Sequence, residues 1–204
     1  MPKKVAPSFF FIGNHPALDF INTEVVSDGK LVDLLGTWED ILNWLSLSQL
    51  FTKEQIHAVK EKWGPAESKT LVADAVELRT SLQTLVKQAI QGAEGSVEAT
   101  EHVNRILKDQ VTTTRLLRLD GGFFVERQVE VRDPSDLLIP VAEAGVDLLA
   151  HVDFGLVRKC GNPDCVLHFY DNSKNGTRRW CSQKTCGNRM KVAAYLERRK
   201  PKET

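Results

Sequence analysis

The 204-residue sequence predicts a mainly α-helical domain with one small β-hairpin, followed by a short C-terminal module organised around cysteines. Three observations predict this division. Apolar residues recur at alternating spacings of three and four along several long segments, as they do on the buried face of a helix. Two segments rich in branched and aromatic residues flank Gly121-Gly122, a pattern typical of a hairpin. All four cysteines lie within 27 residues near the C-terminus.

The helices of the first half follow from capping residues and apolar spacing. The segment from Ala17 to Thr23 favours a short helix after a turn at residues 13–16. Thr37 is a suitable N-cap for a helix with its apolar face at residues 41–45. The run Thr52-Lys53-Glu54-Gln55 fits a capping box for the next helix, which should end at Gly64-Pro65.

The second half continues with the longest helix, over about residues 67–91, and another over 97–108. The hairpin strands are expected at 115–119 and 123–131. A helix over 133–151 is apolar on most sides and should be central to the core. After Asp153, short apolar pieces, glycine and basic residues replace the long periodic helices. We therefore expect domains at 1–154 and 155–204.

The composition, 42% hydrophobic and 26% charged, is that of a folded globular protein. The apolar run Ser8–Ile12 is too short for a signal peptide. The apolar stretch Leu137–Val152 is interrupted by Glu143 and Asp147, which favours a buried helix over a membrane span. We therefore expect a cytoplasmic protein that does not contact a membrane and whose thiols stay reduced.

Cys160, Cys165, Cys181 and Cys186 form two pairs, each separated by four residues, with fifteen residues between the pairs. Thiolates are soft ligands that suit Zn²⁺, and four of them close its tetrahedron without leaving a catalytic position. The pattern predicts one structural zinc ion. The alternatives are an iron–sulfur cluster, two disulfides or four unrelated buried cysteines.

The residues around the cysteines suggest how the module folds. Residues 160–165 form a knuckle with Gly, Asn and Pro, residues 167–170 and 177–180 are expected as strands, and Cys186 should lie in the first turn of a helix to about Arg199. This order predicts a treble-clef or zinc-ribbon-like module. Met190, Ala193 and Ala194 are expected to pack on the hairpin. Fifty residues bury little core, so the metal should supply most of the stability.

Two segments resemble known families. The run Cys181-Ser-Gln-Lys-Thr-Cys-Gly-Asn-Arg189, with residues 169–175 and 178–180, resembles the CGNR zinc finger. The run Gly13-Asn-His-Pro-Ala-Leu-Asp-Phe-Ile-Asn-Thr23 resembles the opening motif of the ABATE domain, in a turn where glycine is more common than Asn14. The resemblance implies a stress-induced transcription regulator, with DNA as its partner.

The chain has no net charge, but residues 151–204 hold 12 Lys and Arg against 5 Asp and Glu. Such an excess predicts binding to phosphate backbones. A helix that presents Lys191, Tyr195 and Arg198 on one face suits the DNA major groove. The alternative is a solvated or protein-binding face, and Arg179 or Arg189 could instead pair with Asp171. The candidate nucleic-acid-binding residues are Arg178, Arg179, Lys184, Arg189, Lys191, Arg198 and Arg199.

His15, Asp19 and Asn22 lie close together on an otherwise apolar segment, where they could line a pocket for a small-molecule effector. Alternatively, His15 closes a turn while Asp19 and Asn22 bond buried backbone. No catalytic triad order, phosphate loop or catalytic metal spacing is present, so we do not expect an enzyme. His168 could replace a thiolate, but four cysteines suffice.

Together these features predict a transcription regulator that binds DNA through a structural zinc finger, with an N-terminal domain that senses an effector or forms a homodimer. The alternative is a zinc-stabilised module that binds proteins and no nucleic acid.

Overall fold

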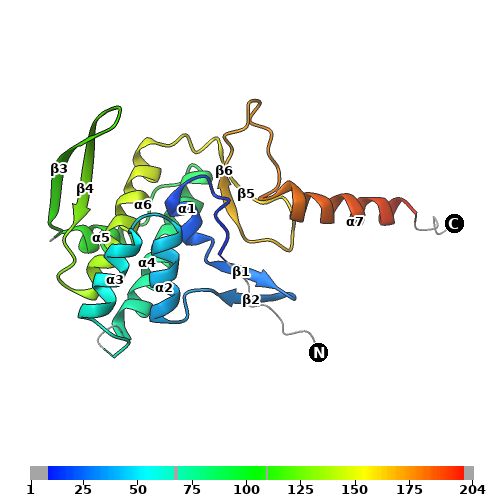
Figure 1. Ribbon diagram of the computed structural model, residues 1–204. Helices are drawn as coiled ribbons and strands as arrows, with labels where there is room; N and C mark the ends of the chain where they lie inside the picture. Colours follow the sequence, from blue (N-terminus) through cyan, green and yellow to red (C-terminus); the bar gives the residue numbers. More distant parts are fainter. Residues whose placement is uncertain (1–8, 67–68, 109, 200–204) are drawn as a thin grey trace. The chain divides into compact units, whose positions relative to one another are not determined.

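A computed structural model describes residues 9–66, 69–108 and 110–199 (Figure 1). The chain forms two compact units, one made of Met1–Leu34 and Asp153–Thr204, the other of Leu35–Val152. The helical unit ends at Val152, two residues before the division expected after residue 154, and residues 9–34 belong to the same unit as the cysteines. Among the described residues, no helix is long and apolar enough to cross a membrane.

The unit of residues 35–152 is helical, as predicted. It contains α2 (Trp38–Leu47), α3 (Lys53–Lys62), α4 (Lys69–Ile90), α5 (Val97–Leu107), a 3₁₀ turn (Pro134–Leu138) and α6 (Ile139–His151). The regularly spaced apolar residues of α4 form the core of this unit. Four of them are fully buried: Leu71, Ala75, Leu78 and Leu82. At Gly145 of α6 an added Cβ would lie 2.5 Å from a methyl carbon of Leu82, so glycine permits this close packing of α4 and α6.

The predicted helix starts are confirmed. The Thr37 side chain accepts from the backbone N–H of Asp40, and Thr52 and Gln55 form a reciprocal capping box. Each bond satisfies an N–H that the first turn leaves without a helical partner. The predicted helix over 133–151 begins instead with the 3₁₀ turn, capped by Asp133.

The predicted hairpin is present as β3 (Thr112–Leu119) and β4 (Gly122–Val129), paired from Thr112↔Val129 to Leu119↔Gly122. These two strands form a sheet of their own.

The other unit contains α1 (Pro16–Ile21), the hairpin of β1 (Glu24–Ser27) and β2 (Lys30–Asp33), the hairpin of β5 (Val157–Lys159) and β6 (His168–Tyr170), a π-helical turn (Gln183–Gly187) and α7 (Asn188–Arg198). Its core joins the four cysteines to apolar side chains from both ends of the chain, namely Val25, Leu34, Leu167 and Phe169. The knuckle lies between β5 and β6, and the last cysteine lies just before α7, which is the treble-clef order.

Two expectations for this unit were wrong, and one element was missed. Residues 177–180 are not a strand, because β6 pairs with β5, and the 177–180 segment is held by side-chain bonds at Arg178 and by one backbone bond from Gly161 to Arg179. The β1–β2 hairpin was not predicted. No residue of α7 is buried, so Ala193 and Ala194 do not pack on a hairpin, and Met190 is only half-buried.

Candidate metal centre

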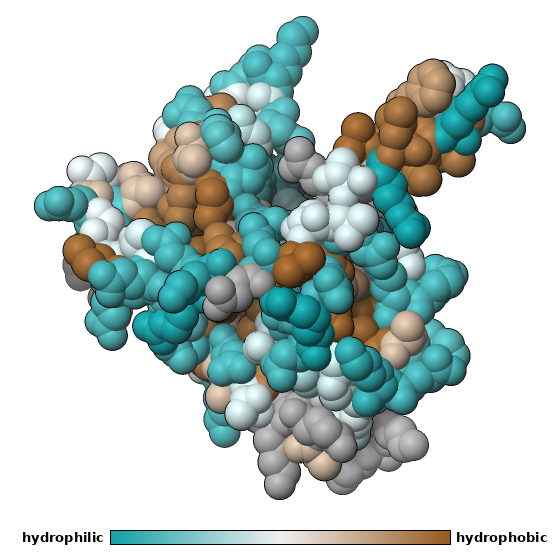
Figure 2. Space-filling model, turned by 90° about the vertical axis from the view of Figure 1, so that its left-hand side faces the viewer, coloured by the Kyte–Doolittle hydropathy of each residue, from teal (hydrophilic) through white to brown (hydrophobic). Residues whose placement is uncertain are grey.

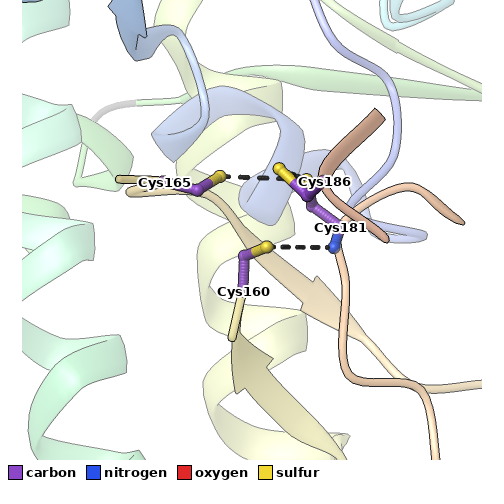
Figure 3. Close-up of side chains that lie close together, drawn as sticks. All are labelled: Cys160, Cys165, Cys181 and Cys186. Atoms are coloured by element: carbon purple, nitrogen blue, oxygen red, sulfur yellow. Dashed lines mark hydrogen bonds between the residues drawn. The ribbon is translucent and has the colours of Figure 1, made fainter. Parts of the chain in front are cut away.

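The four cysteine sulfurs lie together in the interior, contributed by the knuckle, by the residue after 177–180 and by the π-helical turn (Figure 3). All four Sγ atoms lie within 4.8 Å of one another, and Cys181 Sγ is 3.8 Å from Cys165 and 3.6 Å from Cys186. Zn–S bonds of about 2.3 Å at tetrahedral angles place sulfurs roughly 3.8 Å apart. These distances are too long for disulfides and suit one zinc ion.

Polar groups around the sulfurs also suit thiolates. The backbone N–H of Cys181 donates to Cys160 Sγ at 3.3 Å, and the Asn162 side chain donates to Cys186 Sγ at 3.4 Å. Asn162 is itself buried, with 4% of its surface exposed. Donors aimed at sulfur stabilise the negative charge of the ligand set and fix its orientation. Among the described residues the metal-ligating group is these cysteines, and His168 is not part of it.

The thiols of Cys165 and Cys181 interact directly. A hydrogen bond with Cys181 lowers the pKa of Cys165 below its usual value. Because metal ligands must be deprotonated, a lowered thiol pKa favours metal binding.

Asn22, at the end of α1, bonds both backbone groups of one residue in β6. Its amide N–H donates to the carbonyl of His168 at 2.8 Å, and its carbonyl accepts from the His168 N–H at 2.8 Å. Asn22 is 1% exposed. Since His168 follows the knuckle by three residues, this pair of bonds ties the opening segment to the strand beside the metal centre.

The turn before α1 is shaped by the same strand. Asn14 has a φ of 59°, which explains why glycine suits this position, and its side chain donates to Tyr170 O and Asn172 Oδ1. The backbone of Gly13 accepts from Tyr170 N–H at 2.8 Å. A Cβ on Gly13 would lie 2.7 Å from Leu18 Cβ, so only glycine fits.

The proposed effector residues have structural partners. The Gly13 N–H donates to Asp19 at 2.7 Å, and the His15 ring accepts from the backbone N–H of Ala17 as the cap of α1. With Asn22 bonded to His168, these are the bonds that the alternative interpretation predicted. The structure thus places all three residues on one turn and helix, where they hold backbone groups.

Arg178 is a structural residue. Its guanidinium donates to the carbonyls of Ile12, Trp180 and Cys181 and lies 4.1 Å above the ring of Phe169. One side chain therefore joins the opening segment, the metal-binding loop and the core of the unit.

Asp171 does not pair with Arg179 or Arg189. Its carboxylate accepts from Ser173 and from the backbone N–H of Arg178, and Arg158 Nε lies 3.8 Å away. Burial would raise the pKa of Asp171, but these groups together lower it below its usual value. The carboxylate organises the loop that precedes Cys181.

Two family models match the chain. One is ABATE, described as "Putative stress-induced transcription regulator", over residues 14–152, and the other is the CGNR zinc finger, over residues 157–199. The chain belongs to the ABATE family. No curated protein matches it. The ABATE protein carries one structural zinc ion, held by the four cysteines of its CGNR zinc finger.

The other candidate nucleic-acid residues of the ABATE protein are exposed. Arg179 lies over Trp180 with 5.3 Å between guanidinium and ring, and Arg199 donates to the Tyr195 hydroxyl at 3.0 Å. The exposed set on the π-helical turn and α7 consists of Lys184, Arg189, Lys191, Arg198 and Arg199. The structure therefore separates these exposed cations from Arg178. The sequence places Arg178 in the same group because charge alone does not reveal that its guanidinium bonds internal carbonyls.

Replacing Arg178 by Lys tests its structural role. Lysine keeps the charge but cannot reach three carbonyls, so we expect the free energy of unfolding to fall by about 3 kcal/mol. Denaturant titration of the zinc-loaded ABATE protein measures this fall. Arg179→Lys, at the exposed neighbouring position, should change stability by less than about 0.5 kcal/mol. Equal effects of the two substitutions would refute the assignment.

The half-buried carboxyl of Asp19 makes stability depend on pH. Burial raises its pKa to about 6, although backbone N–H groups of Gly13 and Ile12 oppose the rise. Because the native state binds this proton more tightly than the unfolded chain, the contribution of Asp19 to stability decreases as pH rises from about 4 to about 6.

Asp19→Asn removes this charge and keeps an acceptor for Gly13. The free energy of unfolding of Asp19→Asn, minus that of wild type, should rise by about 1 kcal/mol when the pH is raised from 5 to 7.5. Denaturant titration of zinc-loaded protein at the two pH values measures this change. Asp19→Ala should be destabilised at both pH values, since it also loses the acceptor. A pH-independent difference between Asn and Asp would contradict the raised pKa.

Proposed function

We propose that this ABATE protein is a transcription regulator that binds DNA through its CGNR zinc finger. The observation that carries the proposal is the solvent exposure of α7. No residue of this helix is buried, and every Lys and Arg on it is exposed. Lys191, Tyr195 and Arg198 lie at spacings of four and three, so they share one face of the helix. Such a face fits a groove, with cations on phosphates or guanine edges.

The metal supports this role without taking part in chemistry. Four thiolates complete the coordination of zinc and leave no position for water or substrate. The proposal therefore includes no catalytic activity. In this proposal the zinc ion holds the loop and the turn from which α7 starts, so that Lys184 has a fixed position beside the helix and Arg189 has one in its first turn.

Salt dependence of binding to random duplex DNA tests the proposal. Wild type should bind at 50 mM salt, with affinity falling steeply as salt rises, because bound cations release counterions. A Lys191→Ala/Arg198→Ala/Arg199→Ala variant should bind roughly 10- to 100-fold more weakly, with the log–log slope reduced by about 3. Fluorescence anisotropy measures both quantities.

A matched control removes the same charge elsewhere. Lys53, Lys87 and Lys108 are exposed on the helical unit, and their triple alanine variant should keep nearly all the affinity. An equal loss in the two variants would mean that net charge alone drives binding. Absence of wild-type binding at 50 mM salt would refute the DNA-binding role.

One observation favours a protein partner as the second candidate function. Val192 and Leu196 are 58% and 57% exposed, on the side of α7 away from Lys191 and Arg198. A groove beside them is lined by Lys184, Thr185, Asn188, Arg189, Val192, Ala193 and Leu196. If this face binds a protein, Val192→Ser/Leu196→Ser should abolish that partner's capture while leaving DNA affinity unchanged.

A further inference from the structure

The β3–β4 hairpin exposes an unusual amount of apolar surface. Figure 2 views the side on which Figure 1 draws β3 and β4, and brown side chains gather there along a projecting arm. The exposed fractions are 69% for Leu116, 57% for Leu119, 69% for Phe123, 48% for Phe124 and 65% for Val125. A two-stranded ribbon is only marginally stable alone in water. This one therefore calls for a partner.

The register divides these side chains between two faces. Leu116 pairs with Val125 and Arg118 pairs with Phe123, so these four residues lie on one face of the ribbon. Arg118 is exposed. This face thus combines three large apolar side chains with a cation near the tip of the arm.

The same face continues toward the base of the arm, where it forms one wall of a groove of about 1080 Å³. Four residues of this face line the groove, with Val125 at the end nearer the tip: Thr112, Thr114, Val125 and Val129. Helix α6 supplies Pro140, Glu143, Ala144, Val146 and Asp147. On α6, Val146 is 40% exposed, and the carboxylates of Glu143 and Asp147 lie one turn apart on the surface. The groove is lined by apolar side chains and by uncharged glutamines and threonines, and Glu143 and Asp147 make its α6 side acidic.

We propose that two copies of the chain pair by arm exchange, each inserting the Leu116–Val125 face of its hairpin into the groove between the hairpin and α6 of the other. The charges are complementary, since Arg118 on the arm meets Glu143 at the groove. Each copy offers both arm and groove, so the interface is symmetric and closes at two copies.

The available area fits a specific dimer. Fully exposed large apolar side chains present roughly 150–250 Å² each, so the three on the inserted face, which are 65–69% exposed, present about 350 Å² per arm. Two arms bury about 700 Å², and the groove walls that they cover contribute a comparable area, so the sum reaches the size of a specific interface. The pairing involves only the helical unit and is independent of DNA binding.

Charge reversal tests the pairing in the full, zinc-loaded chain. By sedimentation at 1–100 µM, wild type should be a dimer, while Arg118→Glu and Glu143→Arg should each be monomers, because like charges then meet twice. Mixing the two variants should restore a dimer, since both contacts become opposite in sign. A contact within one chain cannot produce this rescue.

Val97→Glu is the control, as Val97 is 72% exposed on α5, outside the groove, and its variant should remain dimeric. A monomeric wild type at 100 µM would overturn the proposal and assign the arm to another partner. A dimer that either charge reversal leaves intact, or a mixture that stays monomeric, would overturn it equally.

Discussion

Replacing Cys165 by Ser is expected to abolish stoichiometric zinc binding and unfold the unit formed by residues 9–34 and 153–199. A neutral hydroxyl cannot replace a buried thiolate, and zinc supplies about 10–16 kcal/mol to small four-ligand modules. We expect the free energy of unfolding of this unit to fall by at least about 5 kcal/mol, enough to unfold it. Mass spectrometry under native conditions counts the zinc, and limited proteolysis locates the unfolded segments.

The helical unit should survive this substitution because it has its own core around α4. Proteolytic cuts should therefore concentrate before residue 35 and after residue 152. Ser182→Ala, beside the ligand Cys181, is the matched control and should bind one zinc ion. Zinc retained by Cys165→Ser, or cuts spread evenly along the chain, would contradict this assignment.

Replacing Asn22 by Asp should have the second largest effect, although Asn22 is not a metal ligand. An aspartate can accept from the His168 N–H, but its other oxygen then faces the His168 carbonyl at a position only 1% exposed. Burying a charge against an acceptor should cost about 3–5 kcal/mol. Denaturant titration and competition with a zinc chelator should both show the loss.

Asn175→Asp is a suitable comparison, because Asn175 is exposed on a loop of the same unit. It should match wild type in stability and in zinc retention. If Asn22→Asp retained zinc as strongly as Asn175→Asp, the bonds to His168 would not support the metal centre.

Local sequence patterns were sufficient to predict much of the fold and the metal ligands. Ligand spacing and thiolate chemistry predicted the zinc site, and the caps at Thr37 and Thr52 act on neighbouring N–H groups, so they are visible within a few residues. The β1–β2 hairpin had such a signal too. Asp28 and Gly29 have φ values of 50° and 72°, and Asp-Gly between short strands is typical of this turn.

Other features depend on contacts that no local pattern contains. Asn22 and His168 are 146 residues apart in sequence, so apolar spacing cannot reveal that the opening segment belongs with the cysteines. Likewise, Arg178 and Arg179 are adjacent and equally charged, yet only the fold shows that the first bonds internal carbonyls. Residue type predicted the ligands, whereas pairing over long distances decided which other residues support them.

The central claim is that zinc holds the opening segment and the cysteine module together as one unit. Hydrogen exchange of the full chain, with zinc and after its removal by a chelator, tests this claim most directly. We predict that amides of residues 17–22 and 168–170 lose protection together, while those of 71–85 in α4 keep theirs. Residues 17–22 that stay protected after zinc is removed would contradict it.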